Sequence, residues 1–120
     1  MNSGPAQTDV EIRAAIDELK EAEKNVRRVR EEGERWQQEN PPPKEPKTVR
    51  RMAEVDEFES SNQEWTKLYG QRRERLEQAQ ARLHAAQKKL GSLLPHHIGY
   101  EYEGKRYQRE GGSYRVDNTG

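Results

Sequence analysis

Apolar and small residues recur between Ile12 and Trp36 at alternating steps of three and four residues. This heptad spacing predicts an amphipathic helix of the kind that pairs in coiled coils. The tetrapeptide TDVE from Thr8 has the form of a capping box, so we predict that the helix begins there and runs to Glu39. The predicted pairing positions are Ile12, Ala15, Leu19, Ala22, Val26, Val29, Gly33 and Trp36.

The sequence NPPPKEPK, from Asn40 to Lys47, should end this helix. Proline has no amide donor, and it disfavours the helical conformation in the residue before it. We interpret the segment as an extended, fairly stiff connector rather than as a docking motif.

A second helical pattern follows the connector and continues to Leu93, where Gly91 and Pro95 should mark its end. Two interpretations fit Ser60 to Asn62. In the first, a new helix begins at Ser61 and a short third helix covers residues 48–58. In the second, one helix runs through Ser60 to Asn62 without a break. The predicted pairing positions of this second pattern are Trp65, Leu76, Ala79, Leu83, Ala86 and Leu90.

Leucine and alanine alternate at the pairing positions of residues 76–90, and large and small residues alternate similarly in residues 12–22. One antiparallel register would bring alanine near alanine at two levels and Trp36 near Trp65. We therefore predict a mainly α fold, with an antiparallel coiled-coil hairpin over residues 8–94.

The pattern changes beyond residue 96, where apolar and charged residues alternate as they do in strands. Turn signals at Glu103-Gly104 and at Gly111-Gly112 predict a small antiparallel β-hairpin or meander over residues 97–117. Such a sheet is too small to be stable alone, so it should lean on the helices, a second copy or a ligand. Residues 1–7 and 118–120 are expected to be disordered ends.

The composition changes this picture by suggesting self-association. Leu, Ile, Val and Phe together supply only 17 of 120 residues, whereas 22 basic and 22 acidic residues balance each other. A lone two-helix hairpin of this composition buries little apolar area. We therefore expect a homodimer or a permanent protein partner.

Residue types that carry catalysis or bind metal are scarce. Cysteine is absent, and His84, His96 and His97 do not have the spacing of metal ligands on one helix face. No carboxylate pair, nucleophile with its base or phosphate-binding loop stands out. We expect no enzyme activity, no metal and no cofactor. Without an apolar run long enough to cross a bilayer, we expect a cytoplasmic protein and no membrane partner.

Four tyrosines and an arginine in the tail are the candidate recognition residues: Tyr100, Tyr102, Tyr107, Arg109 and Tyr114. Tyrosine and arginine are enriched at protein interfaces, which favours a non-catalytic interaction or assembly adaptor. The alternative is a small dimeric nucleic-acid-binding regulator, because aromatic and basic side chains on a sheet also bind single strands. Nearby acidic residues argue against phosphate as the main ligand. Simple packing of the tyrosines against the helices is a third interpretation.

Overall fold

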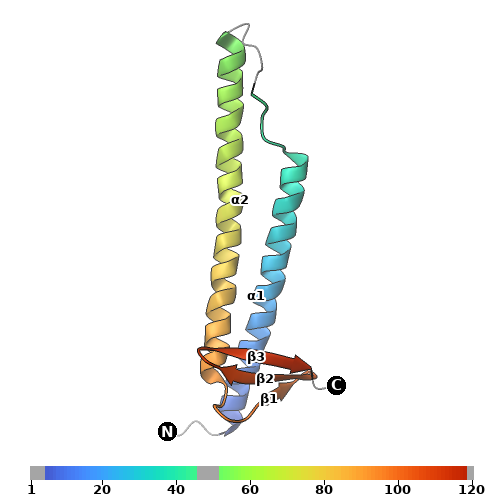
Figure 1. Ribbon diagram of the computed structural model, residues 1–120, viewed down its shortest axis with the longest axis vertical. Helices are drawn as coiled ribbons and strands as arrows, with labels where there is room; N and C mark the ends of the chain where they lie inside the picture. Colours follow the sequence, from blue (N-terminus) through green and yellow to red (C-terminus); the bar gives the residue numbers. More distant parts are fainter. Residues whose placement is uncertain (1–4, 46–51, 119–120) are drawn as a thin grey trace. The chain divides into compact units, whose positions relative to one another are not determined.

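The computed structural model describes residues 5–45 and 52–118. Two long helices are followed by a three-stranded antiparallel sheet, so the fold is mainly α with a C-terminal meander, as predicted (Figure 1). The elements are α1 (Pro5–Glu39), α2 (Met52–Leu93), β1 (Tyr100–Tyr102), β2 (Lys105–Glu110) and β3 (Ser113–Asn118).

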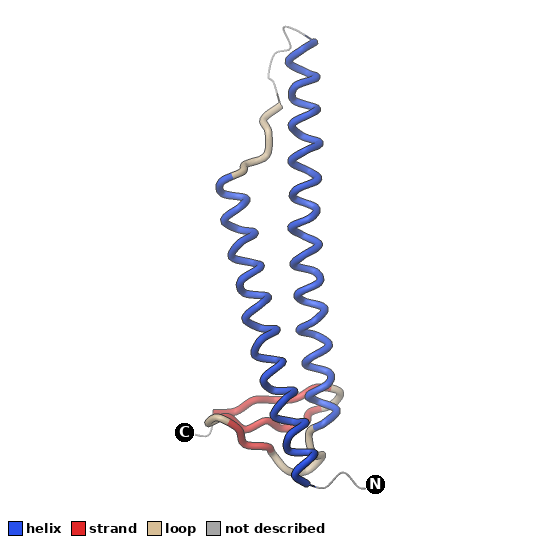
Figure 2. The backbone as a smooth tube through the Cα atoms, turned by 180° about the vertical axis from the view of Figure 1, so that it is seen from behind, coloured by secondary structure: helices blue, strands red, loops and turns tan. Residues whose placement is uncertain are grey.

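The chain divides into two compact units. The first, the sheet unit, consists of Met1–Val26 and Ala79–Gly120, and the second, the aromatic unit, consists of Arg27–Gln78. In each unit a segment of α1 lies beside a segment of α2 and runs in the opposite direction (Figures 1 and 2). This arrangement gives the helical hairpin that the heptad pattern predicts.

Helix α1 begins earlier than the capping box indicates. It starts at Pro5, so Thr8 lies inside the helix and does not cap its first turn. A proline suits the first helical position, because its ring fixes φ and its missing amide hydrogen is not needed there. Of the segment 1–7 predicted to be disordered, residues 5–7 are helical and residues 1–4 lie outside the described residues.

The end of α1 agrees with the predicted effect of the prolines. The backbone amide of Asn40 donates to the carbonyl oxygen of Trp36 at 2.8 Å, and the Asn40 side chain donates to the same oxygen at 3.0 Å. Residues 41–45 then have no regular structure. The last two residues of the predicted connector, Pro46 and Lys47, lie outside the described residues.

Helix α2 runs without a break through Ser60 to Asn62, which decides between the two interpretations of this segment. Residues 52–58 belong to α2 and form no separate helix; residues 48–51 lie outside the described residues. The predicted end is confirmed, because α2 runs to Leu93, between Gly91 and Pro95. Gly91 is buried, and a Cβ there would lie 2.9 Å from the Cα of Ser113. Glycine at this position therefore allows β3 to approach the helix.

The sheet has the order β1-β2-β3, with both neighbouring pairs antiparallel. Both predicted turns are present. Glu103 and Gly104 join β1 to β2 with φ angles of 52° and 76°, the two positive values that a type I′ turn requires. Gly111 has a φ of 60° in the second turn, a conformation that favours glycine.

Helix α1, helix α2 and the sheet all contribute side chains to the core of the sheet unit, because the sheet lies across the paired segments of the two helices (Figure 2). Most predicted pairing positions of this unit are buried, and Leu83 packs against them partly exposed. The pattern missed Ile16 and Leu94, which are 0% and 2% exposed. Both broaden the apolar face beyond a two-helix seam, as a third layer requires. The buried apolar side chains are Ile12, Ala15, Ile16, Leu19, Ala22, Val26, Ala79, Ala86, Leu90, Leu94 and Tyr107.

Candidate functional site

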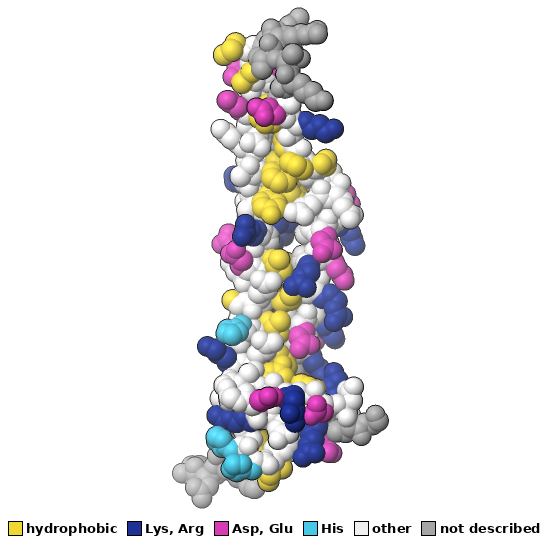
Figure 3. Space-filling view, viewed as in Figure 1, with side chains coloured by type: hydrophobic (Ala, Val, Ile, Leu, Met, Phe, Trp, Pro, Cys, Tyr) yellow, Lys and Arg dark blue, Asp and Glu magenta, His cyan; other side chains and the backbone are white. Residues whose placement is uncertain are grey.

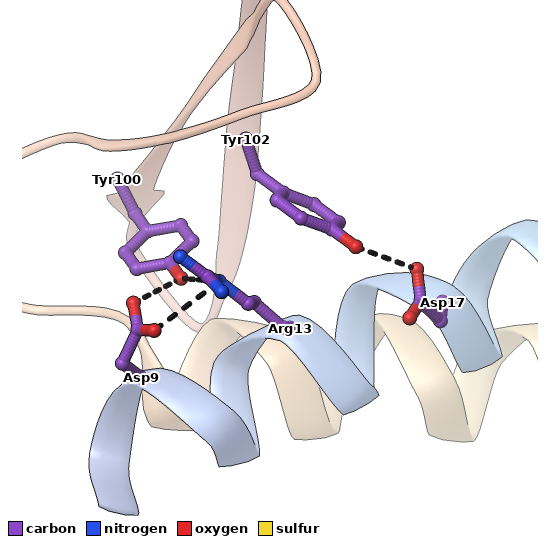
Figure 4. A network of polar contacts seen from close by, with 5 residues as sticks. All are labelled: Asp9, Arg13, Asp17, Tyr100 and Tyr102. Carbon is purple, nitrogen blue, oxygen red and sulfur yellow. Dashed lines mark hydrogen bonds and ion pairs between the residues drawn. The ribbon is translucent and has the colours of Figure 1, made fainter. Parts of the chain in front are cut away.

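The tyrosines of β1 point toward α1 (Figure 4). The Tyr100 hydroxyl donates to Asp9, and Arg13 donates to the Tyr100 oxygen at 3.1 Å and pairs with Asp9 at 3.2 Å. The Tyr102 hydroxyl donates to Asp17 at 3.3 Å. Burial, and then the bond to Asp9, raises the pKa of Tyr100. These contacts hold β1 on α1 within the sheet unit.

The other two tyrosines lie deeper in the same unit. Tyr107 is 3% exposed, and the Tyr114 ring is 6.2 Å from the Tyr107 ring between centroids. Burial raises the pKa of Tyr107, and it raises the pKa of Tyr114 to about 12. The face of the sheet that carries the four tyrosines is therefore turned toward the helices.

The remaining predicted recognition residue, Arg109, also contacts its own chain. Its guanidinium donates to Nε2 of His96 at 3.1 Å. Lys20 of α1 pairs with Glu103 in the first turn and lies 5.4 Å from the centroid of the Tyr102 ring. This ion pair lowers the pKa of the Glu103 carboxyl and raises the pKa of Lys20.

The opposite face of the sheet carries polar and charged side chains. Arg106 lies over Gly99, where a Cβ would collide with its guanidinium. Arg115 pairs with Asp117 at 3.3 Å and donates to Gln108 at 3.2 Å. This face therefore carries charged residues of both signs, and its strand positions carry no aromatic ring.

A different aromatic cluster lies in the aromatic unit. The Trp36 and Trp65 rings are 5.9 Å apart between centroids, so the predicted proximity of the two tryptophans is present. Tyr69 stacks on Trp65 at 5.1 Å, and the Arg72 guanidinium lies 5.8 Å from the Trp36 ring centroid. The Trp65 ring nitrogen donates to the carbonyl oxygen of Asn40 at 2.7 Å, which holds the start of the connector against α2.

This cluster is less covered than the seam of the sheet unit. Among the described residues of the aromatic unit, no side chain is buried, and the pairing residues Val29, Trp36, Trp65 and Leu76 are all half-buried. On the face seen in Figure 3, apolar side chains reach the surface along the helices, between Lys, Arg, Asp and Glu. No third layer covers the seam in the described part of this unit.

A groove of about 360 Å³ opens over the cluster, and we call it the aromatic groove. Gly33 leaves room for it, since a Cβ at Gly33 would have no atom within 4 Å. Sequence reasoning placed Gly33 at a pairing position without recognising a binding surface there. The signal available in the sequence was a heptad seam with a glycine, Gly33, at one pairing position and with aromatic and basic residues at neighbouring positions. The groove is lined by Val29, Arg30, Gly33, Glu34, Trp36, Gln37, Tyr69, Arg72, Arg73 and Leu76.

Within residues 5–45 and 52–118, no three His, Asp or Glu side chains gather as metal ligands would. In the same ranges no helix combines the length and the apolarity needed to cross a membrane.

Comparisons with known proteins do not supply a function. No protein-family model, curated protein or solved structure matches the chain.

Proposed function

We propose that the protein is a non-catalytic protein-interaction module that binds an amphipathic helix along the aromatic groove. The observation that supports this most is the half-buried state of Trp36, Trp65 and Tyr69. Aromatic side chains of this size stabilise a fold most when they are buried, and exposed clusters of them are typical of interaction sites. Helix-in-groove binding needs an apolar groove between two helices, which the aromatic unit provides.

The charges around the groove indicate what kind of helix it binds. Three lining residues are arginines, Arg30, Arg72 and Arg73, and one is acidic, Glu34. A ligand helix with acidic residues beside its apolar face would therefore be attracted, and a basic one repelled. Arg72 also lies over Trp36, so it can contact both an apolar side chain and a carboxylate.

The tyrosine sheet has a different part in this proposal. Nucleic-acid stacking and protein recognition both require accessible rings, yet Tyr107 is 3% exposed and Tyr114 packs against the same core. We infer that the sheet closes the core of the sheet unit and leaves recognition to the aromatic unit. The nucleic-acid alternative has no specific observation in its favour.

A pair of synthetic peptides tests the proposal. Both form amphipathic helices with identical leucine positions, and one carries glutamate where the other carries lysine. Trp36 lines the groove, and Trp65, the other tryptophan of the chain, packs against the lining residues Trp36 and Tyr69, so tryptophan fluorescence should report binding. We expect the acidic peptide to shift their emission to shorter wavelengths in a saturable way at submicromolar protein, and the basic peptide to leave it unchanged.

Two variants make the result specific. Arg72→Glu should weaken binding of the acidic peptide at least tenfold, because it reverses a charge that lines the groove. Ile98→Ser is the matched control, since Ile98 is an apolar residue that is 70% exposed and lies outside the groove. Absence of saturable binding by either peptide, or equal binding by both variants, would contradict the proposal.

A further inference from the structure

The chain itself contains a helix segment with the properties that the aromatic groove selects. The first part of α2, residues 52–61, has apolar side chains at Met52, Val55 and Phe58, three residues apart. It carries four acidic residues and no basic one. We call residues 52–61 the acidic segment; its carboxylates are Glu54, Asp56, Glu57 and Glu59.

Among the described residues, few cover the acidic segment. Helix α1 has already ended at Glu39, and the described residues beside Phe58 and Glu54 are Pro43 and Lys44 of the connector. Met52 is 75% exposed, whereas Val55 and Phe58 are half-buried. In the described part of the aromatic unit, the segment therefore presents an incompletely buried apolar face flanked by negative charge.

We propose that the aromatic groove binds the acidic segment of a second copy of this chain, and that the second copy returns the contact. This inference rests on the proposed function and names its partner. The reciprocal arrangement is the ordinary isologous contact of a twofold dimer. Both complementary surfaces lie on the aromatic unit, so each dimer closes two grooves at once.

The spacing of residues along α2 fits an antiparallel pairing of this helix with α2 of the second copy. One register sets Phe58 opposite Tyr69 and Glu54 opposite Arg73, with the twofold axis near residues 63 and 64. Phe58 would then extend the stacked rings of Tyr69 and Trp65. Glu54 would pair with Arg73. Within one chain, Arg73 pairs with the exposed Glu77, which lies one turn further along α2, at 3.5 Å. Apolar contact at the centre and charge pairing at the edge is the usual anatomy of an interface.

Charge exchange tests this register. Sedimentation equilibrium of the full chain should show a monomer–dimer equilibrium. Glu54→Arg and Arg73→Glu should each raise the dissociation constant at least tenfold, because each places like charges opposite one another. Combining the two substitutions in one chain exchanges the charges, so opposite charges face each other again in both copies and most of the affinity should return. Glu101→Lys, on the outer face of the sheet, is the matched charge reversal and should leave the dimer unchanged.

Disulfide trapping gives an independent measurement, because the chain has no cysteine of its own. Positions 54 and 73 are nineteen residues apart on one helix, which is roughly 28 Å and far too long for an internal disulfide. Glu54→Cys combined with Arg73→Cys should form a covalent dimer on mild oxidation. Gln78→Cys combined with Glu54→Cys, a pairing outside the register, should form little of it.

The outcomes separate this inference from the proposed function. A chain that stays monomeric at all concentrations, or a dimer indifferent to both charge reversals, would overturn the second-copy proposal. If such a chain still bound the acidic peptide, the groove would retain its proposed function with a different partner. Loss of both peptide binding and dimerisation would overturn both.

Discussion

Gly91 and Gly33 show how one residue type serves two different purposes in paired helices. Gly91 is buried and allows the backbone of Ser113 to lie directly on α2. Gly33 has open space around it and leaves the aromatic groove empty. Both weaken helix propensity by about 1 kcal/mol relative to alanine, so each position needs a tertiary reason. For Gly91 that reason is packing, and for Gly33 we propose binding.

Alanine substitutions distinguish the packing role. Gly91→Ala should destabilise the protein by about 1–3 kcal/mol, because the new Cβ would lie 2.9 Å from Ser113 and force β3 outward. Gly70→Ala is the control, since a Cβ at Gly70 meets nothing within 4 Å and should stabilise α2 by up to about 1 kcal/mol. Urea unfolding followed by circular dichroism measures both. Equal effects at the two positions would contradict the close approach of β3.

Tyr114 should make the fold sensitive to alkaline pH. Burial raises its pKa from 10.0 to about 12, so the folded state retains the hydroxyl proton longer than the unfolded chain does. The stabilisation is complete below pH 10 and is lost as the pH rises toward 12. Because the residue is only half-buried, we expect a loss on the order of 1 kcal/mol. Tyr114→Phe should flatten the decline of the unfolding free energy across this range, and an unchanged slope would contradict the assignment.

Among the elements, β1 and the first turn are attached to α1 mainly by polar contacts. Asp9, Arg13 and Asp17 hold the two tyrosine hydroxyls, and Lys20 holds Glu103 (Figure 4 shows the first three). The participating side chains are mostly exposed, so each contact contributes modestly to stability. Together they fix where β1 lies, while Tyr107 is the buried residue of the sheet and the other three tyrosines pack partly buried against the same core.

A double-mutant cycle measures the Lys20–Glu103 pair. Substituting each residue by alanine, singly and together, should give a small favourable coupling near neutral pH. The pair lowers the pKa of Glu103 below its ordinary 4.5, so its contribution is complete above that pH and is lost as the pH falls through the lowered pKa. A coupling that persisted at pH 2 would show that the pair acts through packing instead.

The heptad pattern predicts the helix pairing well because it is a local property repeated over many turns. It brings Trp36 and Trp65 together and selects the buried alanines correctly. The direction in which the tyrosine face of the sheet points, by contrast, depends on contacts between residues far apart in the sequence. Alternation places Tyr100 and Tyr107 on one face of the sheet, but only packing on the helices decides whether that face is covered. The third interpretation of these residues, packing against the helices, agrees with their burial.

The start of α1 illustrates the same limit, whereas the end of α2 lies between Gly91 and Pro95 as predicted. Glycine near a helix end usually indicates termination, and a capping box usually indicates a start. In this chain Gly91 near the end of α2 also allows the contact with β3, and a proline in the first turn begins α1 upstream of the box. The aromatic groove also escaped prediction, because a missing side chain at Gly33 becomes a cavity only after two helices pair.

For the molecule as a whole, the two units differ in how their seams are covered. In the sheet unit the meander covers the helices, and Ile16 and Leu90 are both 0% exposed. In the described part of the aromatic unit nothing comparable covers Trp36 and Trp65, which remain half-buried. We infer that one unit is complete within the chain and that the other is completed by a partner.

Removing the sheet tests the first half of this comparison. A chain that ends at Leu94 loses Tyr107, whose burial contributes about 1.5–3 kcal/mol, and exposes the apolar face around Ile16. We expect lower helicity, a broader thermal transition and stronger binding of a hydrophobic dye. Val10→Ser, which changes an apolar residue of the same unit that is 63% exposed, should leave all three nearly unchanged. A truncated chain as stable as the full one would show that the sheet is dispensable.

The composition of the sheet unit also has a consequence for biosynthesis. It joins residues 1–26 to residues 79–120, so the apolar face around Ile12 and Ile16 meets its partners only after most of the chain has been translated. Contacts of such long sequence separation form slowly. During translation α1 is synthesised well before these partners, so its apolar face stays uncovered until α2 and β2 have been made.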